Sequence, residues 1–150
     1  MKTILLCLLI GFTLSYNCQA AINYAKNYWS HYNSRYANYA SMGGDCSNFV
    51  SQCLIAGGQS LTGCKSLVSW IDNHGCLPRV RDLDKCLRKL KWKRSTSKPA
   101  GFKAGYPMIL TDLSHAIIAT SVSGNKIKYA GHTTNRFDHP LGSSVYYYYK

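Results

Sequence analysis

Cys46 has the sequence setting of a reactive thiol. It follows the flexible turn Gly43-Gly44 and Asp45, a residue type that favours the N-cap of a helix, and the apolar pair Phe49-Val50 follows within one turn. Exposed amide groups at a helix N-terminus lower the pKa of a thiol there. They can also bind a developing oxyanion, with the Cys46 backbone N–H as the nearest donor. The pattern predicts Cys46 as a nucleophile.

A thiol nucleophile needs a general base, and the chain has five histidines. His115 opens an apolar, β-branched run over 115–122 that predicts a buried strand, whose edge can face a helix N-terminus packed on the sheet. His132 comes near the end of the next predicted strand and could orient the imidazole, with Asn135 as the alternative. We expect the remaining histidines, which stand in polar contexts, to be solvated: His31, His74 and His139.

The elements that must position these residues are helices first and strands afterwards. Residues spaced by three and four predict a first helix, with Ile22, Ala25, Trp29, Tyr32 and Tyr36 on one face. A second helix is predicted from Cys46 to the stop at Gly57-Gly58, and a third around 83–90. Strands are predicted at 108–110, 115–122, 126–133 and 145–149. This order predicts a single α+β domain of N-terminal helices on an antiparallel sheet.

Residues 1–20 have the pattern of a secretory signal peptide. Lys2 precedes an apolar core over 4–14, which is shorter than the ~20 residues that a membrane span needs, and Ala20 is a suitable cleavage position. The sequence predicts no transmembrane segment after it. We therefore expect a catalytic domain over 21–150 that is secreted, either outside the cell or into the lumen of a secretory or phagocytic compartment.

Export makes the number of cysteines informative. Cleavage after Ala20 removes Cys7 and Cys18 and leaves five cysteines, so one thiol would stay free after pairing; cleavage before Cys18 would leave six. In an oxidising compartment the disulfide candidates are Cys53, Cys64, Cys76 and Cys86. Three connectivities are possible, and the shortest loops pair Cys76 with Cys86 and Cys53 with Cys64. The spacing shows no zinc-type ligand set, and we predict no metal or other cofactor.

The chain is strongly basic. Eighteen Lys and Arg against six Asp and no Glu give a formal charge of +12. Such a surface attracts polyanions, and charge alone does not choose among nucleic acid, acidic lipid and an anionic bacterial wall. No nucleic-acid-binding motif is present. Although a charge run is usually a solvated face, we interpret the densest one as attracted to an anionic target: Arg79, Arg81, Lys85, Arg88, Lys89, Lys91, Lys93 and Arg94.

The run from Gly43 to Leu54, GGDCSNFVSQCL, resembles the signature of the Putative amidase domain family, which is related to the NlpC-type cell-wall peptidases. Residues 112–118 resemble that family's histidine strand, and residues 129–136 its next segment, in the same order. The chain departs from the family at Gly105-Tyr106-Pro107, where relatives carry a Gly-Asp pair. The resemblance implies a papain-like fold, with Cys46 as nucleophile, His115 as base and acid, and His132 as the orienting residue.

The sequence therefore predicts a secreted cysteine amidase or endopeptidase that hydrolyses amide bonds in bacterial peptidoglycan through a thioester. Its expected partner is peptidoglycan or another anionic cell-wall polymer, without specific nucleic-acid binding, and we expect a monomer. One alternative is a non-catalytic, basic antibacterial or binding module on the same fold. The other is a papain-like protease that acts on proteins.

Overall fold

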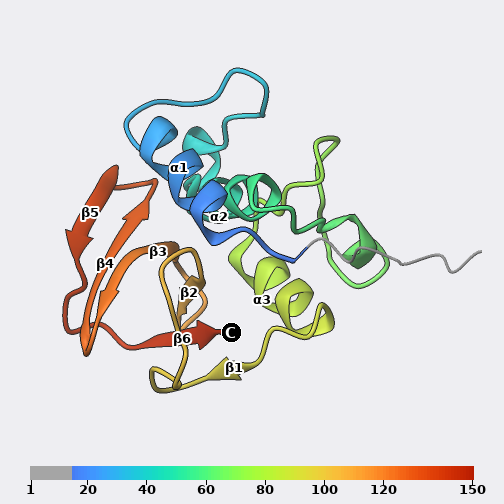
Figure 1. Cartoon of the computed structure of the whole chain (residues 1–150). Helices are drawn as coiled ribbons and strands as arrows, with labels where there is room; N and C mark the ends of the chain where they lie inside the picture. The colour runs from blue at the N-terminus through green and yellow to red at the C-terminus, as the bar shows by residue number, and fades with distance from the viewer. Residues whose placement is uncertain (1–14) are drawn as a thin grey trace, which may run out of the picture.

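Three helices lie on one face of an antiparallel sheet in the computed structural model, which describes residues 15–150 (Figure 1). The helices are α1 (Cys18–Tyr28), α2 (Cys46–Ala56) and α3 (Val80–Lys89). Six strands follow: β1 (Arg94–Ser95), β2 (Pro107–Leu110), β3 (Ala116–Ser123), β4 (Lys126–Gly131), β5 (Arg136–Pro140) and β6 (Tyr146–Tyr149). The α+β class and the helices-then-strands order predicted from the sequence are confirmed.

The sheet has the strand order β1-β6-β2-β3-β4-β5, with every neighbouring pair antiparallel. Side chains alternate between its two faces. On the helix face, Ile118 and Ala130 pack against α1 and α2. On the opposite face, Ile117 and Ile127 pack beneath Phe102, from the segment between β1 and β2. Both faces of β3 are therefore covered, which explains its nearly continuous apolar run.

The helix α2 lies at the centre of the domain. Its first nine residues, Cys46 to Leu54, are all buried, polar ones included. The Ser47 hydroxyl donates to the Leu77 carbonyl over 2.6 Å, and the Ser51 hydroxyl accepts from the Leu77 amide over 3.1 Å. Since buried polar groups need partners, these bonds fix the segment before α3 against α2.

The structure corrects the predicted first helix. The sequence pattern extended it to Tyr36, whereas α1 begins at Cys18 and ends at Tyr28. The side chain of Asn33 accepts from the Arg35 amide over 3.0 Å, a local bond that favours a turn over a helix. Two elements were not predicted: β1, with two residues, and β5, whose Arg136–Pro140 sequence is polar and contains Asp138 at φ 53°.

The predicted disulfide pairing is wrong. Cys64 is bonded to Cys86, with Cα atoms 5.4 Å apart, which joins the loop after α2 to α3. Cys53 and Cys76 are buried free thiols. Loop length favoured the other pairing, but Cys53 faces the α1 side of the core while Cys64 and Cys86 share the α3 side. Tertiary placement therefore decides the pairing.

Residues 15–20 are part of the folded unit. The side chain of Asn17 caps α1 by accepting from the Ala20 amide over 2.9 Å, and the Asn17 amide donates to the Gly57 carbonyl over 2.8 Å. The Tyr16 hydroxyl donates to the Gly105 carbonyl over 2.7 Å, and its ring occupies the space that a Cβ on Gly57 would need. The predicted signal peptide thus lies outside the described residues over 1–14 and within the fold over 15–20.

Cleavage after Ala20 would remove these contacts. We expect a chain that begins at Ala21 to lose at least about 3 kcal/mol of unfolding free energy relative to one that begins at Ser15, since it lacks the half-buried, hydrogen-bonded Tyr16 and a helix cap. Urea unfolding followed by tryptophan fluorescence measures the difference. The point variant Asn17→Ala, which removes only the cap, should lose about 1 kcal/mol. Equal stability of the two chains would contradict this account of residues 15–20.

Candidate active site

Cys46 is the first residue of α2 and lies against the start of β3. Its side chain is 7% exposed and belongs to the same buried cluster as Ala116, the first residue of β3. The thiol therefore lies against the backbone of the residue that directly follows His115. Cys46 and His115 are 69 residues apart in the sequence, and the contact between α2 and the start of β3 brings their backbones into the same region.

Burial controls the protonation of this thiol. It raises the pKa of Cys46 above the ordinary 9.0, although hydrogen bonds from the Ala116 and Ser47 backbone and from the Thr133 hydroxyl lower it in part. The sequence-based expectation of a lowered pKa is thus wrong in direction, because desolvation outweighs the helix N-terminus. At neutral pH the thiol keeps its proton and needs a base to become a nucleophile.

The imidazole of His115 is uncharged at neutral pH and can act as that base. Burial lowers the pKa of His115 below its ordinary 6.5, since a desolvated imidazole disfavours its charged form. A turn immediately before the strand sets its position, in which the Asp112 carboxylate accepts from the Ser114 amide over 3.0 Å and from the Ser114 hydroxyl over 2.6 Å. A Cβ on Gly131 would lie 3.8 Å from Nε2 of His115, so the ring lies over the end of β4.

The turn before Cys46 depends on Gly44. Its φ is 115°, a conformation that residues with side chains rarely adopt, and a Cβ there would lie only 2.8 Å from the Thr133 hydroxyl oxygen. Thr133, itself at φ 82°, brings its hydroxyl to the Cys46 thiol. Sequence reasoning did not identify Thr133. It follows β4 in a polar turn, and only tertiary packing brings it to Cys46.

Asp45 does not use its carboxylate to cap α2. It occupies the N-cap position without a side-chain capping bond, and it is completely buried. One oxygen accepts from the Tyr39 amide over 3.0 Å and from the Asn48 side-chain amide over 2.8 Å. The other lies 2.8 Å from Nδ1 of His132. The first-turn amides of α2 therefore have no side-chain cap.

The imidazole of His132 contacts the Asp45 carboxylate directly. Its ring is 2% exposed, and Nδ1 faces the Asp45 carboxylate while Nε2 lies 2.7 Å from the Tyr28 carbonyl. Both neighbours are hydrogen-bond acceptors, one a carboxylate and the other a backbone carbonyl. The ring also stacks on Phe49 with centroids 4.1 Å apart. These contacts join α1, α2 and the end of β4, and they occupy both nitrogens with which His132 could have oriented His115.

The other predicted residues are dispersed. Asn135 is exposed in the turn between β4 and β5. The basic run over 79–94 does not form one free surface: Asp84 lies 2.9 Å from Arg88 and 3.1 Å from Arg94, and the amine of Lys89 donates to the Gly63 carbonyl. Within residues 15–150 no group of three His, Cys, Asp or Glu side chains is arranged to hold a metal ion. No helix in that range is both long and apolar enough to cross a bilayer.

Comparison with known proteins identifies one family. Residues 15–98 match the family described as "Putative amidase domain". The chain is also similar to "Uncharacterized protein YhbB" of Bacillus subtilis (strain 168), with 38% identity over 53 residues. That match covers 35% of this chain and 16% of the relative, so the chain spans only a small part of that protein. No solved structure matches the chain at a significant level.

The contacts of His132 predict a large effect on stability. The substitution His132→Asn leaves the buried Asp45 carboxylate without its imidazole partner, and we expect the free energy of unfolding to fall by about 3–5 kcal/mol. Urea denaturation measures the loss. The matched control is His31→Asn, an exposed histidine for which the change should stay within about 0.5 kcal/mol. An effect of His132→Asn no larger than that of the control would show that the buried pair is not a stabilising element.

Proposed function

Because this chain belongs to the Putative amidase domain family, we propose that it hydrolyses amide bonds with Cys46 as the nucleophile and His115 as the base. The family suggests amide hydrolysis, and the observation that supports a thiol mechanism is the position of Cys46. The thiol lies at the start of a buried helix, next to the backbone of the residue that follows the half-buried His115. The papain-like arrangement implied by the sequence is part of this proposal.

The reaction starts from a neutral pair. His115, uncharged at neutral pH, takes the proton of the Cys46 thiol as the sulfur attacks the carbonyl carbon of the amide. A sulfur–carbon bond forms, and the carbonyl oxygen becomes an oxyanion. The histidinium then donates the proton to the departing nitrogen, the carbon–nitrogen bond breaks, and a thioester remains. Water, deprotonated by His115, hydrolyses the thioester and restores the thiol.

The start of α2 supplies the donors for the oxyanion. The amides of its first turn have no side-chain cap, because the Asp45 carboxylate is directed to Tyr39, Asn48 and His132 instead. The Cys46 backbone N–H is the donor next to the reacting sulfur, and amide groups at a helix N-terminus stabilise negative charge. The Thr133 hydroxyl adds a donor to the thiolate.

His132 acts through position in this proposal. Its two ring nitrogens bind Asp45 and Tyr28, so it holds the residue before the nucleophile rather than the imidazole of His115. Asn135, in the turn after β4, is too exposed to be the buried third member of a triad. We therefore propose a Cys46–His115 dyad with a structural Asp45–His132 pair behind it.

The substrate we propose is an amide bond of bacterial peptidoglycan, with the protein acting after secretion. The formal charge of +12 favours association with the anionic polymers of a bacterial wall. A nucleophile that is only 7% exposed suits a narrow substrate such as a stem peptide more than a folded protein surface.

Digestion of purified peptidoglycan tests this proposal. Released fragments, identified by mass spectrometry, should appear with the unmodified protein and be lost after treatment with iodoacetamide. Cys46→Ala should abolish them, and His115→Ala should slow their release by about 10²–10⁴-fold, the usual contribution of a general base. Cys18→Ser, which removes a partly exposed thiol outside the site, is the matched control and should keep full activity.

Two other outcomes point elsewhere. Degradation of casein without release of wall fragments would favour a protease that acts on proteins. Lysis of bacteria by Cys46→Ala as fast as by the unmodified protein would favour a non-catalytic antibacterial module.

The dyad also predicts a broad pH profile. His115 accepts a proton only above its pKa, which burial lowers from 6.5, so the acid limb of kcat/KM should lie below pH 6.5. The proton that His115 passes to the leaving nitrogen comes from the Cys46 thiol, so activity falls when this thiol ionises before substrate binds. Burial raises the pKa of Cys46 above 9.0. The alkaline limb should therefore lie above pH 9. A profile that falls between pH 7 and 8.5 would instead indicate an already ionised thiol.

A further inference from the structure

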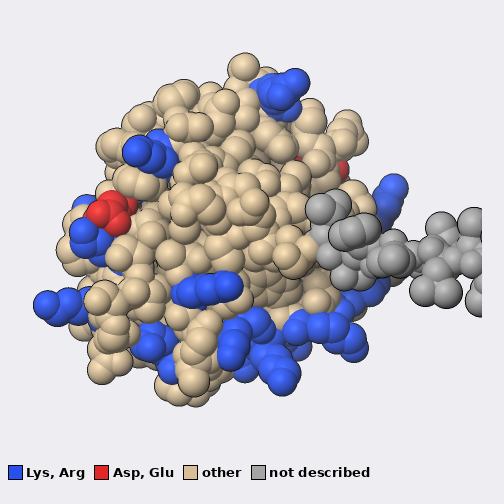
Figure 2. All heavy atoms as spheres, in the orientation of Figure 1, with Lys and Arg blue, Asp and Glu red and all other residues tan. Residues whose placement is uncertain are grey.

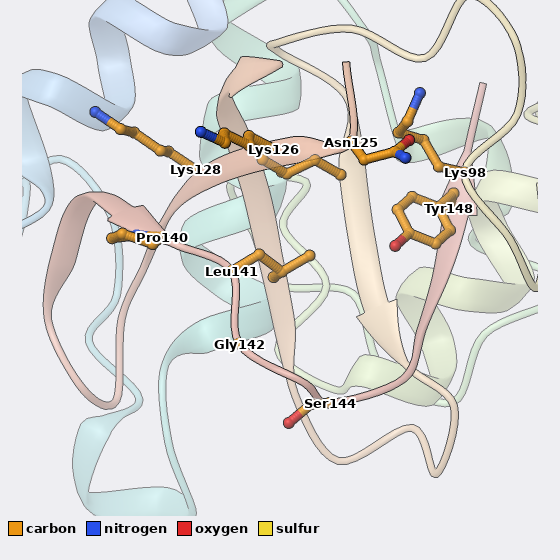
Figure 3. A pocket seen from close by; sticks show the side chains of 10 residues that line it. Lys98, Asn125, Lys126, Lys128, Pro140, Leu141, Gly142, Ser144 and Tyr148 are labelled. Carbon is orange, nitrogen blue, oxygen red and sulfur yellow. The ribbon is translucent and has the colours of Figure 1, made fainter. Parts of the chain in front are cut away.

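A lysine-lined hollow lies far from Cys46. It has a volume of about 530 Å³ and is bordered by Lys98, Lys126, Lys128 and Tyr148, with Leu141 on its floor (Figure 3). Lys126 begins β4 opposite the last residue of β3, whereas His115 precedes the first. An eight-residue strand therefore separates Lys126 from His115, a distance of roughly 25 Å, whereas Tyr148 lies two strands across the sheet from the start of β3.

A second hollow, of about 400 Å³, is also bordered by lysines. Its border includes Lys91, Lys103 and Lys150, beside Trp92 and Tyr106. The segment 96–106 contributes to both hollows, through Lys98 to the first and Lys103 to the second. The C-terminal segment does the same, through Tyr148 of β6 and Lys150, which follows that strand. The two hollows are therefore neighbours on either side of one stretch of chain.

The surface around these hollows is positive. Figure 2 shows Lys and Arg side chains across the lower part of the view, where Figure 1 places β1, and no acidic side chain there. Of the residues that border the two hollows, none is acidic within the described range. Lys128 is paired with Asp138 over 2.9 Å, and Lys150 donates to the Ala100 carbonyl. The remaining lysines of the two hollows are available for an anion.

We propose that the two hollows together bind one extended polyanion, a phosphodiester-linked polymer without bases. The four amines that are not engaged elsewhere, from Lys91, Lys98, Lys103 and Lys126, suit a chain of repeated charges better than one small ion. The border contains Lys but no Arg, and ammonium groups bind phosphate as separate point charges, without the bidentate fork that Arg offers to phosphate and carboxylate alike. The proposal locates the anionic partner on the surface and does not depend on hydrolysis at Cys46.

The aromatic side chains argue against a nucleic acid as the polymer. Binding of single-stranded nucleic acid uses open aromatic faces on which bases stack. Here the ring of Trp92 contacts Tyr16 and Tyr106 edge-on, at 5.2 and 5.3 Å between centroids. The amine of Lys103 lies 5.5 Å from the centre of the Tyr106 ring. These rings are engaged with one another, which leaves charge as the main feature presented to a ligand.

Binding of fluorescent poly(glycerol phosphate), measured by anisotropy, tests the proposal, since this probe has no amide bond to hydrolyse. The variants Lys98→Gln/Lys126→Gln and Lys91→Gln/Lys103→Gln each remove two amines from one hollow. Each should weaken binding about tenfold or more at 0.1 M salt and reduce the dependence of log K on log salt concentration by about 2, which is about 1 for each amine removed. Thermal unfolding confirms that each variant is folded.

The control is Lys26→Gln/Lys85→Gln, which removes the same charge at exposed positions outside both hollows and should weaken binding less than threefold. An equal effect of control and test variants would overturn the proposal in favour of net charge alone. Weakening by only one test pair would overturn the claim that the polymer spans both hollows. Equally tight binding of inorganic phosphate, or of a single-stranded oligonucleotide, would overturn the choice of ligand. Cys46→Ala should bind as the unmodified protein does, so a failure of binding and a failure of hydrolysis are distinguishable.

Discussion

The Asp45 carboxylate is the buried charge around which the site is built. It is fully buried, and the Tyr39 amide, the Asn48 side chain and the His132 ring all contact it, which compensates the cost of its burial. A buried carboxylate without such partners would cost several kcal/mol. His132 follows β4 and also contacts the Tyr28 carbonyl at the end of α1, so the buried Asp45–His132 pair joins α1 and α2 to the sheet. Because Asp45 directly precedes Cys46, the same pair also fixes the position of the thiol.

The contacts of Asp45 leave the start of α2 uncapped. Because Asp45 is bound by other groups, the amides at the start of α2 have no side-chain cap, and the helix end remains available to a developing negative charge. Burial of Cys46 and His115 favours the uncharged form of each, so the thiol is protonated and the imidazole is free to accept its proton. The reactive pair therefore stays neutral until a substrate is present.

The sequence predicted the local features of this site better than the tertiary ones. The Gly43-Gly44-Asp45 turn, the helix start at Cys46 and the strand after His115 follow from residue types and spacing, and the structure has all three. The Cys64–Cys86 bond, the contact of Thr133 with Cys46 and the partners of His132 depend on which faces of distant elements meet. Neither the hydrophobic periodicity of the sequence nor the lengths of its loops show which faces of distant elements pack together. The two-residue strand β1 and the polar strand β5 form through pairing with neighbours rather than through their own pattern.

The central claim is that His115 activates the Cys46 thiol, and the rate of alkylation of Cys46 tests it without any assumption about substrate. Iodoacetamide labelling at pH 7, followed by peptide mass spectrometry of each cysteine, compares the unmodified protein with His115→Ala. The account predicts that the rate at Cys46 falls at least about tenfold in the variant, since a neutral thiol of raised pKa reacts slowly without a base, while labelling of Cys18 is unchanged. Equal rates at Cys46 in the two proteins would contradict it.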